Sequence, residues 1–176
     1  MLSENYLASI QRQLMNYKVL AEKAMDQLQP PDLFLQPNEE SNNIAIIVQH
    51  MAGNMISRWT DLFNSDGEKS WRNRDAEFEI DLNTKEAVMQ RWEQGWSCLL
   101  KSVAEIKPGQ LEENILIRNE PHTVVEAINR QLTHYAYHVG QIVYLSKQFK
   151  GKAFKSLSIP KNESQLFNEN NFGKAQ

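Results

Sequence analysis

Apolar residues recur every three or four positions in four long stretches of the chain, which is the spacing of helices that bury one face. Polar and charged residues fill the positions between them, and proline, glycine or clusters of turn-forming residues separate the stretches. We predict helices from about Ser3 to Leu28, from Ser41 or Asn42 to just before Asn64, from Asn83 to just before Pro108, and from Thr123 to Gly151.

The last two helices carry clear start signals. Asn83 and Glu86, and then Thr123 and Glu126, have the spacing of a capping box, in which two side chains satisfy free backbone N–H groups at the start of a helix. Pro30-Pro31 ends the first helix, because proline cannot continue the ladder of hydrogen bonds and restricts the residue before it.

Four periodic helices in 176 residues predict an all-α fold, a four-helix bundle that forms a single domain over residues 1–176. The connection over residues 64–82 is long, which argues against plain up-down-up-down winding. Residues 111–117 have a partly β-like pattern and are expected to form a short strand or an extended connection before the fourth helix. The polar tail, residues 152–176, is expected to pack on the bundle rather than fold by itself.

Two histidines of the fourth helix form the clearest candidate for chemistry. His134 and His138 are four residues apart, so their side chains share one face of the helix. Two imidazoles so placed can bind one metal ion at about 2.0–2.1 Å per bond. His50, midway along the second helix, can complete a three-histidine site with open positions, which is the pattern of catalytic rather than structural zinc. Imidazole donors suit nickel or zinc, with iron, cobalt and manganese as further choices, whereas calcium and magnesium prefer oxygen.

The same four-residue spacing also occurs on ordinary solvated helix faces. From spacing alone, the alternative to a metal site is therefore a pair of histidines on the surface. Tyr135 follows His134 where a zinc-protease helix has glutamate, so this helix supplies no general base. His122, just before the fourth helix, is interpreted mainly as a turn residue and a weaker ligand candidate. A glycine such as Gly53 inside a helix lowers stability by about 1 kcal/mol relative to alanine. Close approach of another group, such as a neighbouring helix, would explain why glycine occupies this position.

Other reactive or charged residues have simpler interpretations. Cys98 is expected to be packed and inert, because the sequence pairs it with no base. Arg72 and Arg74 lie in a loop rich in charges of both signs, residues 66–77. An anionic ligand is one interpretation of this loop, but a salt-bridged loop or a dimer contact is favoured. Core positions are predicted for three tryptophans, Trp59, Trp92 and Trp96.

Composition excludes several classes of function. The net charge of −3 leaves no basic excess to neutralise a nucleic acid backbone. No apolar run reaches the ~20 residues of a membrane span. The N-terminal residues also lack the basic and apolar segments of a secretion signal. Cys98 is the only cysteine, which rules out an intramolecular disulfide and favours the cytoplasm.

Four blocks of the sequence resemble a known family: residues 46–59 around His50, the charged segment 66–78, residues 130–145 with the histidine pair, and 156–160 in the tail. These blocks resemble the DinB-like superfamily, also called YfiT-type metal-dependent hydrolases, and within it a bacterial subfamily of unknown function. The resemblance covers nearly the whole chain. It implies a four-helix bundle, often dimeric, in which three histidines hold a divalent metal ion. By position those ligands are His50, His134 and His138.

The resemblance also suggests what such a site does. Characterised members include transferases and isomerases that use low-molecular-weight thiols such as bacillithiol or mycothiol. The first hypothesis is therefore a metal-dependent enzyme, a thiol transferase or a hydrolase acting on a small electrophile. Tyr137 and Gln141 would support the ligands and Arg58 would meet a substrate carboxylate. The alternatives are a non-enzymatic metal-binding stress-response protein with a structural ion, and an interaction module with neither metal nor pocket.

Overall fold

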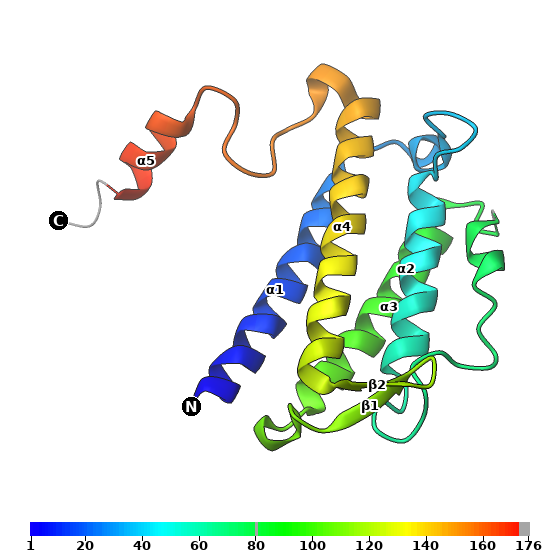
Figure 1. The fold of residues 1–176 in the computed structure, drawn as a ribbon. Helices are drawn as coiled ribbons and strands as arrows, with labels where there is room; N and C mark the ends of the chain where they lie inside the picture. The colour runs from blue at the N-terminus through cyan, green and yellow to red at the C-terminus, as the bar shows by residue number, and fades with distance from the viewer. Residues whose placement is uncertain (80, 173–176) are drawn as a thin grey trace.

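The computed structural model describes residues 1–79 and 81–172, with side chains described as far as Asn170. Within this range the chain is mostly helical, in agreement with the all-α prediction, and a two-stranded sheet accompanies the helices. Four long helices lie side by side in Figure 1: α1 (Leu2–Met25), α2 (Ile44–Trp59), α3 (Lys85–Glu105) and α4 (Val124–Lys150). The helix α2 packs chiefly against α3, and α1 packs chiefly against α4.

One hydrophobic core runs between the four long helices and contains their apolar stripes. Trp92, Trp96 and Tyr135 are among its largest fully buried side chains. Trp59 is buried too, and its indole N–H donates a hydrogen bond to the Tyr135 hydroxyl at 3.0 Å, which satisfies its polar atom inside the core. The predicted core positions of the three tryptophans are confirmed.

The predicted helix ends hold at α4 and fail at the start of α3. Thr123 and Glu126 form the expected capping box, and Gly151, with a φ of 59°, ends α4. The predicted cap at Asn83 is wrong. Thr84 is the cap, and its hydroxyl accepts a backbone N–H of the first turn at 3.1 Å. Threonine is also a favoured cap residue, although a weaker one than asparagine, and α3 begins one residue later than predicted.

Helix α2 is shorter than its apolar stripe suggested. Its cap is Asn43, which accepts a first-turn N–H at 2.9 Å, and not Ser41 or Asn42 as predicted. The helix ends at Trp59, because Thr60 is extended and Asp61 adopts a φ of 47°. Leu62 is nevertheless buried, so it reaches the core from the following loop rather than from the helix.

Helix α1 also ends earlier than its stripe suggested. Its last residue is Met25, three residues before the predicted end at Leu28. Leu28 stays buried, and the chain continues into the 3₁₀ turn Pro30–Phe34. In both helices, buried apolar residues therefore continue at helical spacing beyond the last helical residue.

The partly β-like segment before α4 forms a hairpin. Its strands, β1 (Asn114–Ile117) and β2 (Glu120–Thr123), pair antiparallel. The turn residues Arg118 and Asn119 have φ values of 57° and 61°, the conformation of a tight hairpin turn. The Asp66 carboxylate accepts the backbone N–H groups of both turn residues, at 2.9 and 2.7 Å. These bonds tie the loop after α2 to the hairpin.

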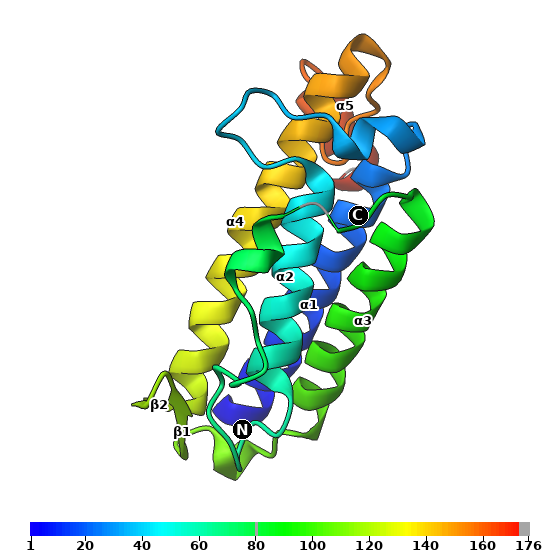
Figure 2. The ribbon, with the colours of Figure 1, turned by 90° about the vertical axis from the view of Figure 1, so that its right-hand side faces the viewer.

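The long connection between α2 and α3 runs back along α2 (Figure 2). Its 3₁₀ turn, Asp75–Phe78, packs against the helix. Gln49 of α2 fixes this turn by donating to the carbonyl oxygens of Ala76 and Glu79, at 3.0 and 2.9 Å. The connection therefore brings a charged segment to one face of α2.

The chain beyond α4 touches the long helices near their ends. The backbone N–H of Lys155 donates to the Gln27 side chain at 2.7 Å. Helix α5 (Ser164–Phe172) stands away from the four long helices in Figure 1, and its side chains over residues 164–170 are exposed. Within residues 1–79 and 81–172, no helix has the length and apolar character needed to cross a membrane.

Candidate metal centre

Three histidines from two helices converge at one point. His50 lies in the middle of α2, and His134 and His138 lie one turn apart on α4, the neighbouring helix in Figure 2. The side-chain nitrogens that could bind a metal all lie within 4.8 Å of one another. The Nε2 atom of His134 is 3.4 Å from Nε2 of His50 and 3.1 Å from Nε2 of His138. Two nitrogens bound tetrahedrally to one ion at about 2.0–2.1 Å are themselves about 3.3 Å apart. The three histidines are therefore close enough to hold one metal ion.

Hydrogen bonds to the outer nitrogens fix how two of the rings are oriented. Nδ1 of His50 contacts Oε2 of Glu77 at 2.9 Å, and Nδ1 of His138 contacts Oε1 of Gln141 at 2.8 Å. An oxygen acceptor at Nδ1 keeps the proton there and leaves the Nε2 lone pair free. The Nε2 lone pairs of both rings are then available at the common point, to bind a cation or to accept a hydrogen bond from His134.

Each supporting group is itself held in place. Arg72 binds the Glu77 carboxylate with two hydrogen bonds, Nε to Oε1 at 2.7 Å and Nη2 to Oε2 at 2.8 Å. On the other side, the Gln141 amide donates to the Tyr137 hydroxyl at 3.0 Å. Phe78 stacks on the His50 ring with centroids 4.8 Å apart. His50 is therefore the most constrained ring of the cluster.

The surroundings of His134 and His138 on α4 keep both imidazoles neutral. Burial and the neighbouring imidazoles of His138 and His50 lower the pKa of His134 to about 3. Burial lowers the pKa of His138 to about 4, against the opposing hydrogen bond to Gln141. Neutral imidazole is the form that binds metals, so neither ring has to lose a proton at neutral pH before it can act as a ligand.

Glu77 is ionised in spite of its surroundings. Its burial favours the neutral acid, but the hydrogen bonds from His50 and Arg72 outweigh that effect and hold its pKa below the usual value. The carboxylate therefore places a fixed negative charge against the back of His50. Such a charge strengthens a metal-bound imidazole by increasing its basicity.

Gly53 explains how Glu77 reaches the helix. A Cβ atom at Gly53 would lie 2.3 Å from Oε1 and 2.7 Å from Cδ of Glu77. The predicted close approach is therefore real, but the approaching group is a loop carboxylate and not a neighbouring helix. Sequence analysis missed Glu77 as a partner of His50, and the glycine one turn after His50 was the available signal.

Replacing Glu77 by glutamine is expected to weaken metal binding by about 10- to 100-fold, the usual cost of losing a group that orients a metal ligand. The amide keeps the shape of the side chain but removes its charge and presents an N–H group on one side. Competition with a chromophoric chelator measures the affinity. Glu79→Gln, an exposed neighbour on the same loop, is the matched control and should bind metal as the wild type does. Equal affinity for both variants would show that Glu77 does not support the site.

The remaining candidates from the sequence lie elsewhere or are engaged. His122 is half-buried in β2 and is not part of the histidine cluster. Arg72 is paired with Glu77 and also with Glu68 at 3.2 Å, and the Arg74 guanidinium lies 5.2 Å from the centre of the Phe78 ring. The charged loop is thus a salt-bridged structure, one of the two interpretations that the sequence favoured.

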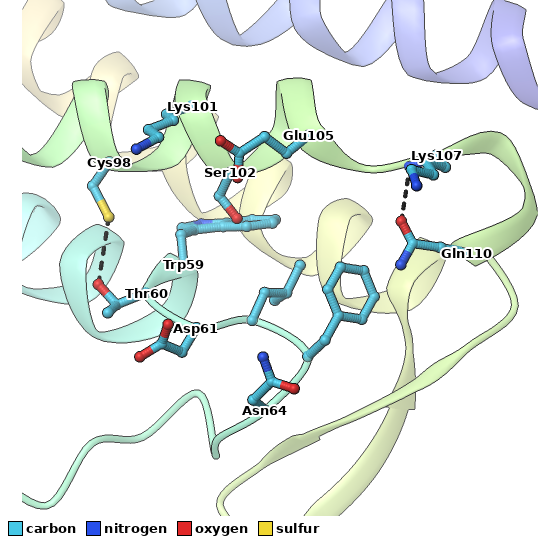
Figure 3. A pocket seen from close by; sticks show the side chains of 12 residues that line it. Trp59, Thr60, Asp61, Asn64, Cys98, Lys101, Ser102, Glu105, Lys107 and Gln110 are labelled. Carbon is cyan, nitrogen blue, oxygen red and sulfur yellow. Dashed lines mark hydrogen bonds between the residues drawn. The ribbon is translucent and has the colours of Figure 1, made fainter.

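Cys98 lines a separate cavity of about 500 Å³ (Figure 3). Its thiol is half-buried and lies 3.6 Å from the Thr60 hydroxyl. Trp59 and Lys101 line the same cavity, but none of the three clustered histidines does. The geometry gives this thiol no place in the histidine site.

Comparison with protein families identifies one matching family. Residues 1–163 match the family described as "Protein of unknown function (DUF1572)". The chain belongs to this family. The region matching the DUF1572 family contains all four long helices, the hairpin and the three clustered histidines. A comparison with curated proteins finds no match. The DUF1572 description names no activity.

Proposed function

We propose that His50, His134 and His138 hold one divalent transition-metal ion, and that the protein is a metal-dependent enzyme. The convergence of three imidazole nitrogens is the observation that carries this proposal. The carboxylate behind His50 and the amide behind His138 supply the outer hydrogen bonds that metal-bound histidines usually have. An interaction module without a metal would instead leave these imidazoles exposed and pointing apart, but His50 and His138 are buried.

The donor set suits a catalytic ion. Three imidazole nitrogens without a ligating carboxylate favour nickel or zinc, with iron, cobalt and manganese as further choices. Three protein ligands leave a coordination position for another molecule, whereas structural sites are usually closed by four. His134 is only half-buried, and a cavity of about 210 Å³ reaches both His134 and His50. A small molecule therefore has access to the cluster.

A bound ion of this class lowers the pKa of a thiol or a water molecule in its open position, so either can react as the anion at neutral pH. Between these two nucleophiles the surrounding residues favour the thiol. Both oxygens of Glu77 are already engaged, and no described residue that lines the cavity is acidic. A thiol has a pKa near 8.5 and water near 15.7, so the thiol depends less on a general base.

We therefore favour transfer of a low-molecular-weight thiol to a small electrophile, in keeping with the resemblance to the DinB-like superfamily. Hydrolysis is the second reaction that the same site would support. The non-enzymatic alternative is a structural ion, which would stabilise the packing of the four long helices.

A turnover assay tests the enzymatic proposal. Protein without a histidine tag, loaded with nickel or zinc, is incubated with a panel of thiols and small electrophiles, and loss of free thiol is followed. We expect turnover with at least one pair by the loaded protein and none after chelation. A large fall in melting temperature on chelation, with no turnover by the loaded protein for any pair, would instead favour the structural ion.

A further inference from the structure

Arg58, in the last turn of α2, is a buried charge with too few partners. The residue is only 3% exposed, and its Nε and Nη1 atoms have no hydrogen-bond partner within the part of the chain that the structure describes. Its Nη2 atom lies 3.7 Å from the Glu68 carboxylate, which is beyond hydrogen-bond distance. A guanidinium group carries five N–H donors, and leaving them unsatisfied away from water is costly. Glu68 therefore offsets part of the charge of Arg58 without satisfying its donors.

The space in front of Arg58 is lined by positive charge. The cavity of about 210 Å³ beside the histidine cluster is lined by five arginines, Arg58, Arg72, Arg74, Arg118 and Arg130. None of the described residues that line it is acidic. The cavity has the volume of about seven water molecules at ~30 Å³ each. It therefore accommodates one charged group with its neighbouring atoms rather than a large ligand.

The carboxylates near these arginines are already engaged. Glu77 binds Arg72 and His50, and Asp66 accepts three backbone N–H groups from loop and hairpin residues. Glu68 is shared among three of the guanidinium groups, at distances from 3.2 to 3.7 Å. Within the described part of the chain, only Arg58, Arg72 and Arg118 have ion pairs with these carboxylates, so the lining of five arginines keeps an excess of positive charge.

We propose that this cavity is an anion subsite, in which Arg58 and Arg130 bind a carboxylate or phosphate group of the substrate beside the histidine cluster. Its role in catalysis rests on the proposed function, whereas the binding of an anion does not. His50 and His134 line the same cavity, so the rest of the bound molecule would face the cluster. Gln131 adds a buried carbonyl oxygen that lacks a donor among the described residues. The preferred substrate is a small oxyanion that also carries a hydroxyl or N–H group.

The test measures binding of inorganic phosphate and of succinate to the metal-free protein by calorimetry, at an ionic strength held constant with sodium chloride. Metal-free protein is used because phosphate can also bind a metal directly. We expect saturable binding of at least one of the two anions with a Kd of about 1 mM or below, an affinity typical of a small, weakly held ligand. Arg58→Met and Arg130→Gln should each weaken it at least tenfold. Arg12→Gln, an exposed arginine of α1, is the matched control and should bind as the wild type does.

Melting temperature distinguishes a binding role from a structural one. Without added anion, Arg58→Met should melt at the same temperature as the wild type or higher, because replacing a poorly paired buried charge by an apolar side chain is often neutral or stabilising. A marked fall in melting temperature together with unchanged anion binding would overturn the proposal, and so would the absence of saturable binding of both anions. Arg130 is exposed, so its variant tests the subsite even if Arg58→Met fails to fold.

The two proposals fail in different measurements. If the metal-free protein binds anions through Arg58 but the histidines take up no metal, the subsite stands and the proposed function fails. If the protein takes up metal but neither phosphate nor succinate binds, the proposed metal site stands and the subsite fails.

Discussion

Replacing His138 by alanine is expected to lower the affinity for nickel or zinc by more than about 100-fold, a larger loss than that from removing a supporting group. His138 is buried, its Nε2 lies 3.1 Å from Nε2 of His134, and its Nδ1 is held by Gln141. Its removal leaves two imidazoles where three converge. Neither remaining histidine can occupy the vacated position, because each is fixed to its own helix.

Chelator competition and circular dichroism together check this prediction. The matched control is His122→Ala, which removes the fourth histidine of the chain from a position outside the cluster. It should bind metal as the wild type does. The His138→Ala protein should keep its helical spectrum, so that lost binding is not lost folding. Equal affinity of wild type and His138→Ala would show that the ion, if any, binds elsewhere.

Replacing Gly95 by alanine is expected to destabilise the protein by roughly 2 kcal/mol, although alanine is the better helix former by ~1 kcal/mol. A Cβ at Gly95 would lie 2.7 Å from the Cα of Ala52 and 3.0 Å from its Cβ. The first of these is a backbone atom of α2, so only a shift of one helix can relieve the clash. That shift would also move His50, two residues before Ala52.

The chain supplies its own control for this effect. Gly140 lies within α4, is exposed, and has nothing within 4 Å of a built Cβ. Gly140→Ala should therefore stabilise the protein by about 0.5–1 kcal/mol through helix propensity alone. Urea unfolding followed by circular dichroism gives both free energies. Stabilisation by both substitutions would contradict the close packing of α2 on α3.

The long helices were predictable because their stripes are local. Each stripe repeats over several turns, and Thr123 with Glu126 marks the start of α4 within four residues of sequence. The ends of α1 and α2 were less predictable. Leu28 and Leu62 continue the apolar period and are buried, but they lie beyond the last helical residues. Burial follows the core, whereas helical hydrogen bonding also depends on backbone angles such as that of Asp61.

The site was predictable only in part, for a similar reason. His134 and His138 share a face of α4 by helical spacing, and His50 was a candidate because it lies midway along the predicted second helix. The contact of Glu77 with His50 joins residues 27 positions apart through an irregular loop. No periodic pattern encodes such a contact, and Gly53 was the one sequence signal that pointed to it.

The burial of Arg58 was unpredictable for a different reason. Arginine is seldom fully buried, and the residue lies in the last turn of α2, where the side chain of an arginine can reach solvent. Its burial depends on the connection after α2, which folds back over the helix. Gly67 in this connection allows close contact with the Arg58 side chain. A Cβ at Gly67 would lie 2.7 Å from Nη1 of Arg58.

The most direct test of the central claim is elemental analysis of the protein, expressed without a histidine tag and purified without chelators. We predict about one equivalent of a transition metal per chain, reduced to background in the His50→Ala and His138→Ala proteins and retained in His122→Ala. A metal-free preparation that takes up neither nickel nor zinc when either is added, or metal content unchanged in the His50 and His138 variants, would contradict the three-histidine site.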